Sequence, residues 1–157
     1  DTLTDLFLLR QLRPWHGNSK KRLVKIPKIY VRDSGILHTL VGIKDYNDLS
    51  SHPIYGASWE GFVIEQILQR MPYRTEATFY RSSAGAEIDL VLETPRNGVY
   101  AIEIKRTLEP KISKGFRLAC EDIQPKQRFY VIPSNSSYPM DKDTQAIGIE
   151  ELIAEIL

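Results

Sequence analysis

The chain has 157 residues, of which 42% are hydrophobic and 26% are charged, a composition typical of one globular domain of ordinary size. Its formal net charge of +1 excludes a domain that binds nucleic acid through a strong overall positive charge. Its single cysteine, Cys120, excludes an internal disulfide and a cysteine-built zinc site, and no apolar run approaches the roughly 20 residues of a membrane helix.

The first 32 residues predict a hairpin-like strip. The run "LFLLRQLRPW" ends at Pro14, and "RLVKIPKIYV" resumes after a turn, with Pro27 making the second run an edge strand or an irregular one. This strip holds eight basic residues and no acidic one between Arg10 and Arg32: Arg10, Arg13, Lys20, Lys21, Arg22, Lys25, Lys28 and Arg32. Such a basic arm is typical of a solvated loop or of a surface that contacts phosphates, and both alternatives stay open.

The rest of the chain predicts alternating helices and strands. A short helix in "DSGILHTLVGI" is capped by Asp33 or Ser34 and ends at Gly42, a loop follows in "YNDLSSHPIYG", and Ser58 caps a longer helix that Pro72 ends. Strands are expected at residues 77–82, 87–93 and 99–105, then a helix in "KISKGFRLACEDI", a strand in "QRFYVIP", and a short strand and helix in "AIGIEELIAEIL". This order predicts an α/β fold with a mixed central sheet flanked by helices.

The hairpin "AEIDLVLETPRNGVYAIEIK" carries charged side chains on strands that otherwise look core-bound. A turn symmetric about Arg96 places Asp89 opposite Glu103 and Glu87 opposite Lys105. Two carboxylates across a ladder repel, and a divalent cation such as Mg²⁺ between them would offset the repulsion. The alternative is a solvated checkerboard of charges on an exposed face. A one-residue slip would spoil the pairing, and a bulge could restore it.

Helix residue Glu60 falls in the middle of an apolar arc formed by Val63, Ile64, Ile67 and Met71, whereas Glu65 falls on the opposite, surface side. A carboxylate aimed at the core is costly unless it is paired or bound to metal. The alternatives are an ion pair with an arginine such as Arg81 or Arg106, or a frayed first turn in which Glu60 favours the helix dipole.

A helix glutamate, a strand aspartate and a Glu-X-Lys strand, here Glu60, Asp89, Glu103 and Lys105, resemble the PD-(D/E)XK nuclease superfamily. The stretches "KIYVRDSGIL", "GASWEGFVIEQIL", "FYRSSAGAEIDLVLE" and "YAIEIKRT" are similar to the uncharacterised C-terminal domain of bacterial and archaeal AAA-type ATPases. The resemblance covers residues 25 to about 132. It departs from the superfamily's usual pattern before Asp89, where the sequence reads "AEI" rather than a proline-aspartate pair.

The resemblance implies a restriction-endonuclease-like fold over residues 33–157, with residues 1–32 forming the end of a winged-helix region. It also implies that Glu60, Asp89 and Glu103 bind Mg²⁺ or Mn²⁺ and that Lys105 positions the attacking water. The expected partners are nucleic acid, most simply DNA, and an N-terminal ATPase domain outside the chain, since the sequence holds no phosphate-binding loop. We therefore expect part of a longer, cytoplasmic protein that hydrolyses phosphodiester bonds.

Two alternatives to hydrolysis stay open at this point. One is the same fold without catalysis, serving its ATPase as a regulatory module that binds nucleic acid or protein. The other is a purely structural role in oligomerisation. Candidate nucleic-acid contacts are Lys20, Lys21, Arg22 and Lys114, although Lys114 also fits an ordinary surface position at the start of a helix.

Overall fold

The computed structural model describes residues 2–17 and 21–157. Its helices are α1 (Thr2–Asp5), α2 (Ser34–Leu40), α3 (Tyr46–Ser51), α4 (Tyr55–Leu68), α5 (Lys114–Ile123) and α6 (Ile149–Ile156). Its strands are β1 (Leu9–Pro14), β2 (Lys28–Val31), β3 (Glu76–Arg81), β4 (Glu87–Thr94), β5 (Gly98–Ile104), β6 (Gln127–Val131), β7 (Tyr138–Pro139) and β8 (Thr144–Ile147).

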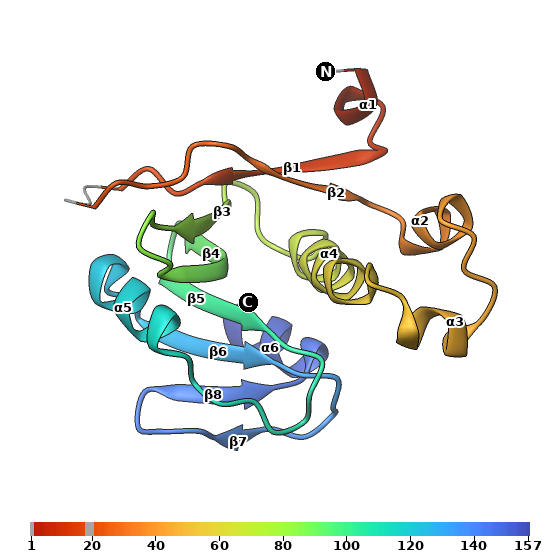
Figure 1. Cartoon of the computed structure of the whole chain (residues 1–157). Coiled ribbons are helices and arrows are strands. Elements are labelled where there is room, and N and C mark those ends of the chain that lie inside the picture. The colour runs from red at the N-terminus through yellow and green to blue at the C-terminus, as the bar shows by residue number, and fades with distance from the viewer. Residues whose placement is uncertain (1, 18–20) are drawn as a thin grey trace.

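Within the described residues, the strands form one eight-stranded sheet in the order β2-β1-β3-β4-β5-β6-β8-β7 (Figure 1). Strands β3, β4 and β5 are antiparallel neighbours, whereas β6 runs parallel to β5 and β8 runs parallel to β6. The predicted mixed sheet flanked by helices is therefore confirmed. The predicted edge strand is confirmed as well, because β2 begins directly after Pro27 and is the terminal strand of the sheet.

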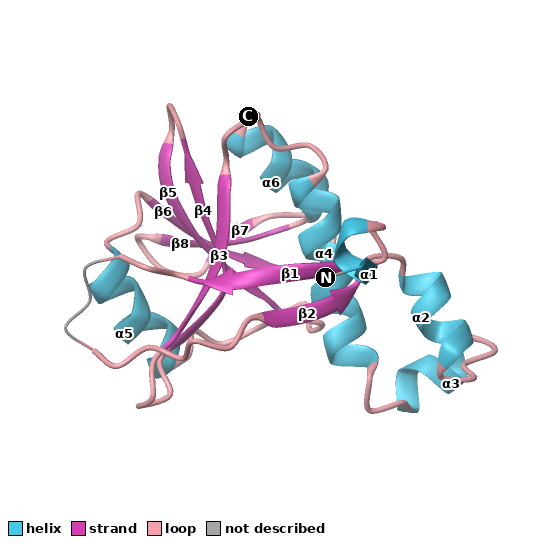
Figure 2. Ribbon diagram, turned by 90° about the horizontal axis from the view of Figure 1, so that it is seen from above, coloured by secondary structure: helices cyan, strands magenta, loops and turns pink. Residues whose placement is uncertain are grey.

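Helices cover both faces of the sheet, as Figure 2 shows, with α5 on one side and α4 and α6 on the other. On the α4 side, side chains of α4 and α6 pack on inward residues of β4 and β5 such as Leu90 and Ile102. On the α5 side, Phe116 and Cys120 pack on Val91 and Ala101. Both cores consist largely of fully buried apolar side chains, which is the main stabilising term of such a layered domain.

The structure corrects two predicted boundaries near the start of α4. The stretch predicted as a loop contains the short helix α3, whose N-cap Asp45 accepts a hydrogen bond from the Asp48 backbone N–H. Helix α4 begins at Tyr55 rather than at Ser58, and Ile54, its N-cap residue, makes no side-chain cap. A residue that can cap a helix marks the helix start only if the helix does not begin before it. By contrast, the predicted cap of α2 is confirmed, since Asp33 accepts a hydrogen bond from the Ile36 N–H.

An irregularity interrupts β4 close to its start. The pairing of β3 with β4 shifts register between Thr78 and Tyr80, opposite the segment from Ile88 to Val91. Accordingly, Ile88 packs in the core on the α5 side while Leu90, two residues later, packs on the α4 side. Regular alternation would place both on one face. A bulge of this kind re-aims the side chains around it, and Asp89 stands at this point.

Candidate active site

The candidate site lies at the edge of the sheet where β4 begins and β5 ends, next to α4. The predicted register of this hairpin is confirmed, because Leu90 pairs with Ile102 and Val91 pairs with Ala101. The paired residues of this hairpin end at Leu90–Ile102, so the pairing of Asp89 with Glu103 stays a prediction. Asp89 and Glu103 are 7% and 6% exposed, which rules out the alternative of a solvated checkerboard.

The bulge directs Asp89 away from the face that strand alternation predicts for it. Its Oδ2 accepts a hydrogen bond from the Ile104 backbone N–H at 3.0 Å, and its Oδ1 lies 3.3 Å from the Nζ of Lys28. Asp89 therefore points toward the α4 side of the sheet, whereas Val91 packs on the α5 side. Glu103 stands between Ile102 and Ile104, which pack on the α4 side, so its side chain leaves β5 toward α5.

Lys28 of β2 lies at the centre of the group of carboxylates on the α4 side. Its Nζ lies 2.8 Å from Glu60 Oε1, 3.1 Å from Glu87 Oε1 and 3.3 Å from Asp89 Oδ1. The Tyr30 hydroxyl, two residues further along β2, donates a hydrogen bond to Glu60 Oε1. An arginine was one of the alternatives that the sequence suggested as a partner for Glu60, and the sequence did not connect Lys28, Tyr30 or Glu87 with it. The signal available was the shared face of Lys28 and Tyr30 on a strand that otherwise reads as apolar.

Glu103 and Lys105 form a second group next to the first. Lys105 Nζ donates a hydrogen bond to Glu103 Oε1 at 2.7 Å. The other oxygen of Glu103, Oε2, is buried and has no hydrogen-bond partner among the described residues. Burial, with the nearby charge of Asp89, raises the pKa of Glu103 to about 7. A buried carboxylate oxygen without a partner is costly, and it is the kind of atom that a cation or a donor from a ligand would satisfy.

We refer to Glu60, Glu87, Asp89 and Glu103 as the acid cluster. Burial and the neighbouring charge of Glu60 raise the pKa of Asp89. Burial alone would lower the pKa of Lys28, but the charges of Asp89 and Glu60 outweigh it and keep the pKa above its usual value. Burial and the charge of Glu60 likewise raise the pKa of the Tyr30 hydroxyl. The charges of the cluster are therefore strongly interdependent, as at sites where charge is concentrated for function.

Glu87 is also held by Arg81, whose guanidinium donates a hydrogen bond to Glu87 Oε1 across the β3–β4 pair. The four carboxylates of the acid cluster thus face three cations: Lys28, Arg81 and Lys105. If all these groups are ionised, one negative charge remains in excess among the described residues, and the charges of Asp89 and Glu87 add to the burial that raises the pKa of Glu103.

A second glutamate of α4 behaves differently from the prediction. Glu65, expected on the solvent side, is 2% exposed and is held by Arg10 of β1 and by Arg32, which follows β2. The apolar arc predicted only the contact with the sheet. It did not anticipate that the β1–β2 hairpin covers the other flank of α4, where Arg10 and Arg32 reach Glu65.

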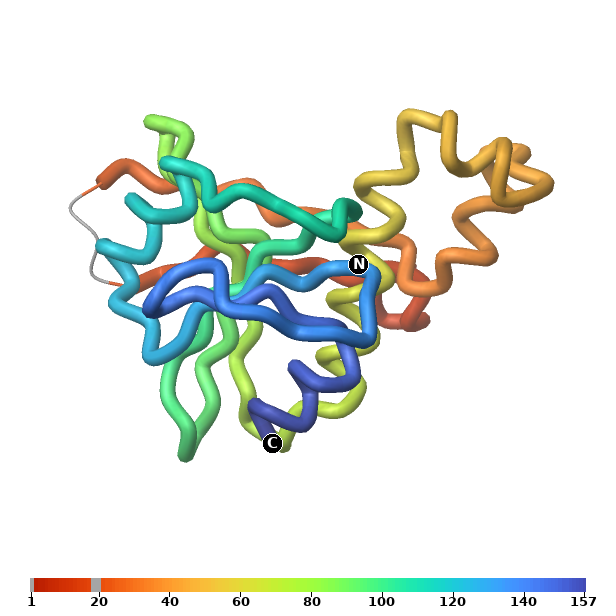
Figure 3. Tube along the Cα trace, turned by 90° about the horizontal axis from the view of Figure 1, so that it is seen from below, coloured from red at the N-terminus to blue at the C-terminus, as the bar shows by residue number. Residues whose placement is uncertain are grey.

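Two of the basic residues proposed to contact nucleic acid, Arg22 and Lys114, lie next to the turn that joins β3 to β4. The segment that leads to β2 runs beside the turn between β3 and β4 (Figure 3), and the Arg22 carbonyl accepts a hydrogen bond from the Ser83 N–H. Lys21 Nζ lies 2.9 Å from Oδ2 of Asp122 in α5. Arg22 and Lys114 are exposed, and Lys20 lies outside the described residues. The first turn of α5 packs tightly on the same turn, because a Cβ on Gly115 would lie 2.8 Å from the Gly85 carbonyl oxygen. Lys114 therefore stands next to the turn that joins Arg81 to Glu87.

The side chains of the acid cluster are chemically suited to a divalent cation, but they are not positioned to bind one. In favour of a cation are the hard oxygen donors, the excess negative charge and the unpartnered Oε2 of Glu103. In residues 2–17 and 21–157, however, no group of three or more histidine, cysteine, aspartate or glutamate side chains is arranged to hold a metal ion. The reason is that Lys28 stands among Glu60, Glu87 and Asp89, while Glu103 leaves its strand on the other face.

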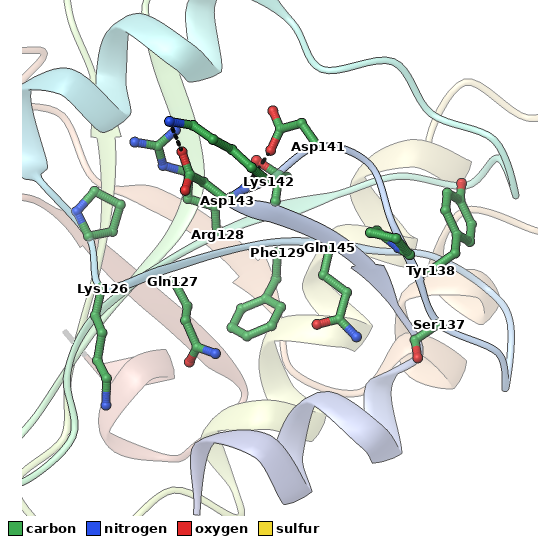
Figure 4. A pocket seen from close by; sticks show the side chains of 13 residues that line it. Lys126, Gln127, Arg128, Phe129, Ser137, Tyr138, Asp141, Lys142, Asp143 and Gln145 are labelled. Atoms are coloured by element: carbon green, nitrogen blue, oxygen red, sulfur yellow. Dashed lines mark hydrogen bonds and ion pairs between the residues drawn. The ribbon is translucent and has the colours of Figure 1, made fainter.

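A separate cavity of about 590 Å³ lies along β6, β7 and β8, between residues such as Gln127, Tyr138 and Gln145 (Figure 4). None of the four predicted catalytic residues lines it. Its polar side chains come largely from exposed loop positions such as Lys142 and Asp143, which pair with each other. The acid cluster remains the stronger candidate, since Asp89 and Glu103 are buried and the half-buried Glu60 and Glu87 converge with Asp89 on Lys28.

Comparisons with known proteins place the chain in a family. A family model described as "Domain of unknown function (DUF4143)" matches residues 55–152, and one described as "Domain of unknown function (DUF8612)" matches residues 1–47. Over 153 residues, 98% of this chain, the sequence is 39% identical to Uncharacterized protein Rv2008c of Mycobacterium tuberculosis and to Uncharacterized protein Mb2031c of Mycobacterium bovis. The match covers 34% of each of these proteins, so the chain spans about a third of their length.

No solved structure matches the chain. Nor do the described residues include a helix with the length and apolar character needed to cross a membrane. The assignment of an activity therefore depends on the site itself.

Proposed function

We propose that the chain, which belongs to the family described as "Domain of unknown function (DUF4143)", is a restriction-endonuclease-like domain whose acid cluster carries out metal-dependent hydrolysis of phosphodiester bonds in nucleic acid. The observation that carries the proposal is the convergence of Glu60, Glu87 and Asp89 on one cation position, within 3.3 Å of the Lys28 ammonium. Asp89 is buried and Glu60 and Glu87 are half-buried, and carboxylates gathered in this way need a cation between them, a place that Lys28 occupies.

In this proposal Glu60, Asp89 and Glu103 hold Mg²⁺ or Mn²⁺, as the sequence resemblance implies. Carboxylate oxygens are the ligands that these cations prefer, and a substrate phosphate commonly completes the set. When bound, such a cation supplies Lewis-acid stabilisation of the negative charge that develops on a phosphate. The unpartnered Oε2 of Glu103 supports its inclusion, because ligation would satisfy that buried oxygen.

Lys105 is the residue proposed to orient the attacking water. Its ammonium carries three N–H donors, one of which is directed to Glu103 Oε1 at 2.7 Å. Glu103 thereby fixes the direction of the side chain, while the Lys105 head remains 38% exposed and accessible to a substrate at the sheet edge. An ammonium in this position both orients a water and offsets the charge of a phosphate.

The basic residues near the β3–β4 turn, Arg22 and Lys114 among them, are proposed to contact the phosphate backbone of DNA. The N-terminal ATPase domain implied by the sequence resemblance is part of the same proposal. The relatives' greater length leaves room for it, since this chain accounts for 34% of each. We also propose a cytoplasmic location, in keeping with a nucleic-acid substrate and with the free, buried thiol of Cys120.

Two measurements test the proposal. In calorimetric titration with Mn²⁺, the chain is expected to bind the ion and Asp89→Ala is expected not to. In a plasmid-nicking assay with Mg²⁺ or Mn²⁺, the chain is expected to nick DNA, and Lys105→Ala is expected to lose this activity. Lys142→Ala is the matched control, since Lys142 is an exposed lysine paired only with Asp143 and should leave nicking unchanged. Equal nicking by the wild type and Lys105→Ala would contradict the assigned role.

A second candidate is a regulatory module that binds nucleic acid or protein without hydrolysis. The observation in its favour is Lys28, which already neutralises part of the acid cluster and separates Glu60 from Asp89. This candidate predicts that the chain retains DNA in a gel-shift assay but neither binds Mn²⁺ nor nicks DNA. If the chain neither binds Mn²⁺ nor retains DNA, a purely structural role in oligomerisation is favoured instead.

A further inference from the structure

The position of Lys28 has a consequence for how any metal enters the acid cluster. The Lys28 ammonium contacts Glu60, Glu87 and Asp89 at once, at 2.8, 3.1 and 3.3 Å. Its side chain is 15% exposed, and its Nζ also lies 5.4 Å from the centre of the Phe79 ring. Lys28 is thus a partly buried cation held by three carboxylates, in the place where a metal ligated by Glu60 and Asp89 would stand.

The charges indicate what can replace it. With Lys28 in place, the acid cluster carries one excess negative charge against its three cations. Without Lys28 the excess is two, which a single divalent cation neutralises. An ammonium and a divalent cation compete for the position, because both are held by the carboxylates of Glu60 and Asp89 and their positive charges repel each other at contact distance.

The strand that carries Lys28 is suited to such an exchange. β2 is the terminal strand of the sheet and pairs with β1. The β1–β2 hairpin is joined to β3 by the pairs Arg13–Thr78 and Pro14–Phe79, by the hydrogen bond from the Trp15 N–H to the Phe79 carbonyl and by the Leu23–Ser82 bridge, none of which involves the Lys28 side chain. Withdrawal of the Lys28 side chain therefore breaks no hydrogen bond of the central ladders β3 to β6. Tyr30, which packs on Gly61 and donates to Glu60, keeps β2 against α4 while the Lys28 head moves.

We propose that the Lys28 ammonium is the resident cation of the acid cluster and that a divalent cation binds by displacing it. Metal loading is then a competition between the ion and the β1–β2 hairpin, and Lys28 keeps the centre closed when the metal concentration is low. The inference rests on the proposed function, because it concerns the metal that Glu60, Asp89 and Glu103 are proposed to hold.

The first test compares Lys28→Met with Arg81→Met by calorimetric titration with Mn²⁺. Lys28→Met removes the competing ammonium and is expected to bind Mn²⁺ on the order of tenfold more tightly than the wild type. Arg81→Met also removes a positive charge, but Arg81 contacts Glu87 at the rim and its side chain is 42% exposed. It is expected to change affinity by less than about threefold. Equal tightening in both variants would overturn the proposal in favour of a general electrostatic effect.

The second test uses the wild-type chain alone, so its result does not depend on whether a variant folds. Acetylation with an amine-reactive ester, followed by mass spectrometry of peptides, measures the accessibility of each lysine. Mn²⁺ is expected to increase the acetylation rate of Lys28 severalfold, because the displaced ammonium loses its carboxylate partners. Lys142, which is exposed and far from the acid cluster in the fold, is the internal control and should not change. Unchanged or slower acetylation of Lys28 in saturating Mn²⁺ would overturn the proposal.

The failure of this inference and that of the proposed function give different results. If Asp89→Asn binds Mn²⁺ as well as the wild type does, the acid cluster is not the metal site and both are overturned. If Mn²⁺ binding depends on Asp89 but Lys28→Met binds no more tightly and Lys28 gains no reactivity, only the displacement of Lys28 is overturned.

Discussion

Helix α4 takes part in two clusters of buried carboxylates that are built in opposite ways. Near its C-terminal end, Glu65 is held by Arg10 and Arg32, so two positive charges surround one negative charge. Near its N-terminal end, Glu60 belongs to the acid cluster, where four carboxylates face three cations. The negative charge of Glu65 is more than neutralised by Arg10 and Arg32, so this glutamate can only hold the β1–β2 hairpin on α4. The acid cluster is under-compensated and keeps an attraction for a further cation.

The pKa values follow the same division. Burial would raise the pKa of Glu65, but the hydrogen bonds and charges of Arg10 and Arg32 bring it below its usual value. Burial and the charge of Asp89 raise the pKa of Glu103 to about 7, and the attraction of Lys105 does not cancel this rise. A carboxylate with a lowered pKa stabilises the fold, whereas one with a raised pKa weakens it at neutral pH in return for a reactive site.

The largest expected effect is the loss of stability in Glu65→Gln. The change leaves Arg10 and Arg32 next to each other without the charge that pairs them, and breaking a buried pair costs about 3–5 kcal/mol. Because the arginine side chains are 27% and 24% exposed, we expect a loss near the lower end, about 3 kcal/mol. Urea unfolding followed by circular dichroism measures it. A loss below about 1 kcal/mol would mean that the two clusters do not differ in the way described.

A slightly smaller effect is expected from Mn²⁺ on thermal stability. At a concentration about one hundred times the dissociation constant, a ligand specific for the folded state adds about 2.7 kcal/mol, which raises Tm by about 5–10 °C in a chain of this size. Asp89→Asn should abolish the shift. Glu65→Gln should retain it in full, although its starting Tm is lower. Loss of the shift in Glu65→Gln would show that the clusters are coupled.

The contributions of the two clusters to stability should change with pH in opposite directions. Glu103 has a folded-state pKa of about 7, above the usual 4.5, so the folded chain binds more protons between these values and stability falls as pH rises through this window. Glu103→Gln removes this loss, and we expect it to be more stable than the wild type at pH 8 by on the order of 1 kcal/mol and little different at pH 4.

The lowered pKa of Glu65 works in the other direction. Its contribution is present above the usual pKa of 4.5 and is lost as pH falls below it, so the deficit of Glu65→Gln should shrink in acid. Urea unfolding of both variants at pH 4 and pH 8 checks the two signs together. A Glu103→Gln variant that is less stable than the wild type at pH 8 would contradict the raised pKa.

The smallest expected effect is that of Glu150→Gln, which serves as a surface reference for both clusters. Glu150 is held by Arg70 at 2.8 Å, yet its side chain is 78% exposed. An exposed pair of this kind contributes little, and we expect a change below about 0.5 kcal/mol in urea unfolding. A loss comparable to that of Glu65→Gln would show that charge pairing on α4 and α6 matters regardless of burial.

Part of the candidate site was predictable from the sequence because it depends on local rules. The turn centred on Arg96 set the register of the hairpin, and the predicted pairing is confirmed from Leu90–Ile102 to Thr94–Gly98. Pro27 marked β2 as an edge strand, and Asp33 marked the start of α2. These predictions succeed because a turn, a missing N–H and a cap act within a few residues.

The partner of Glu60 and the burial of Glu65 were not predictable in the same way. Lys28 is 61 positions from Asp89 in the sequence, and Arg10 is 55 positions from Glu65. No local period connects such residues. The helical arc of α4 accounts for the face on the sheet, but the other flank of the helix is covered by the β1–β2 hairpin, whose position depends on packing across the whole domain.

The sequence by itself determined the order of the main helices and strands, the mixed sheet and the set of charged residues available at its edge, because these follow from periodicity and turn chemistry along the chain. Tertiary structure alone decided how those charges are shared. It placed a bulge at Asp89, sent Glu103 to the other face and brought Lys28 among three carboxylates. Charge compensation depends on distances in space, and distances between remote segments are settled only when the layers pack.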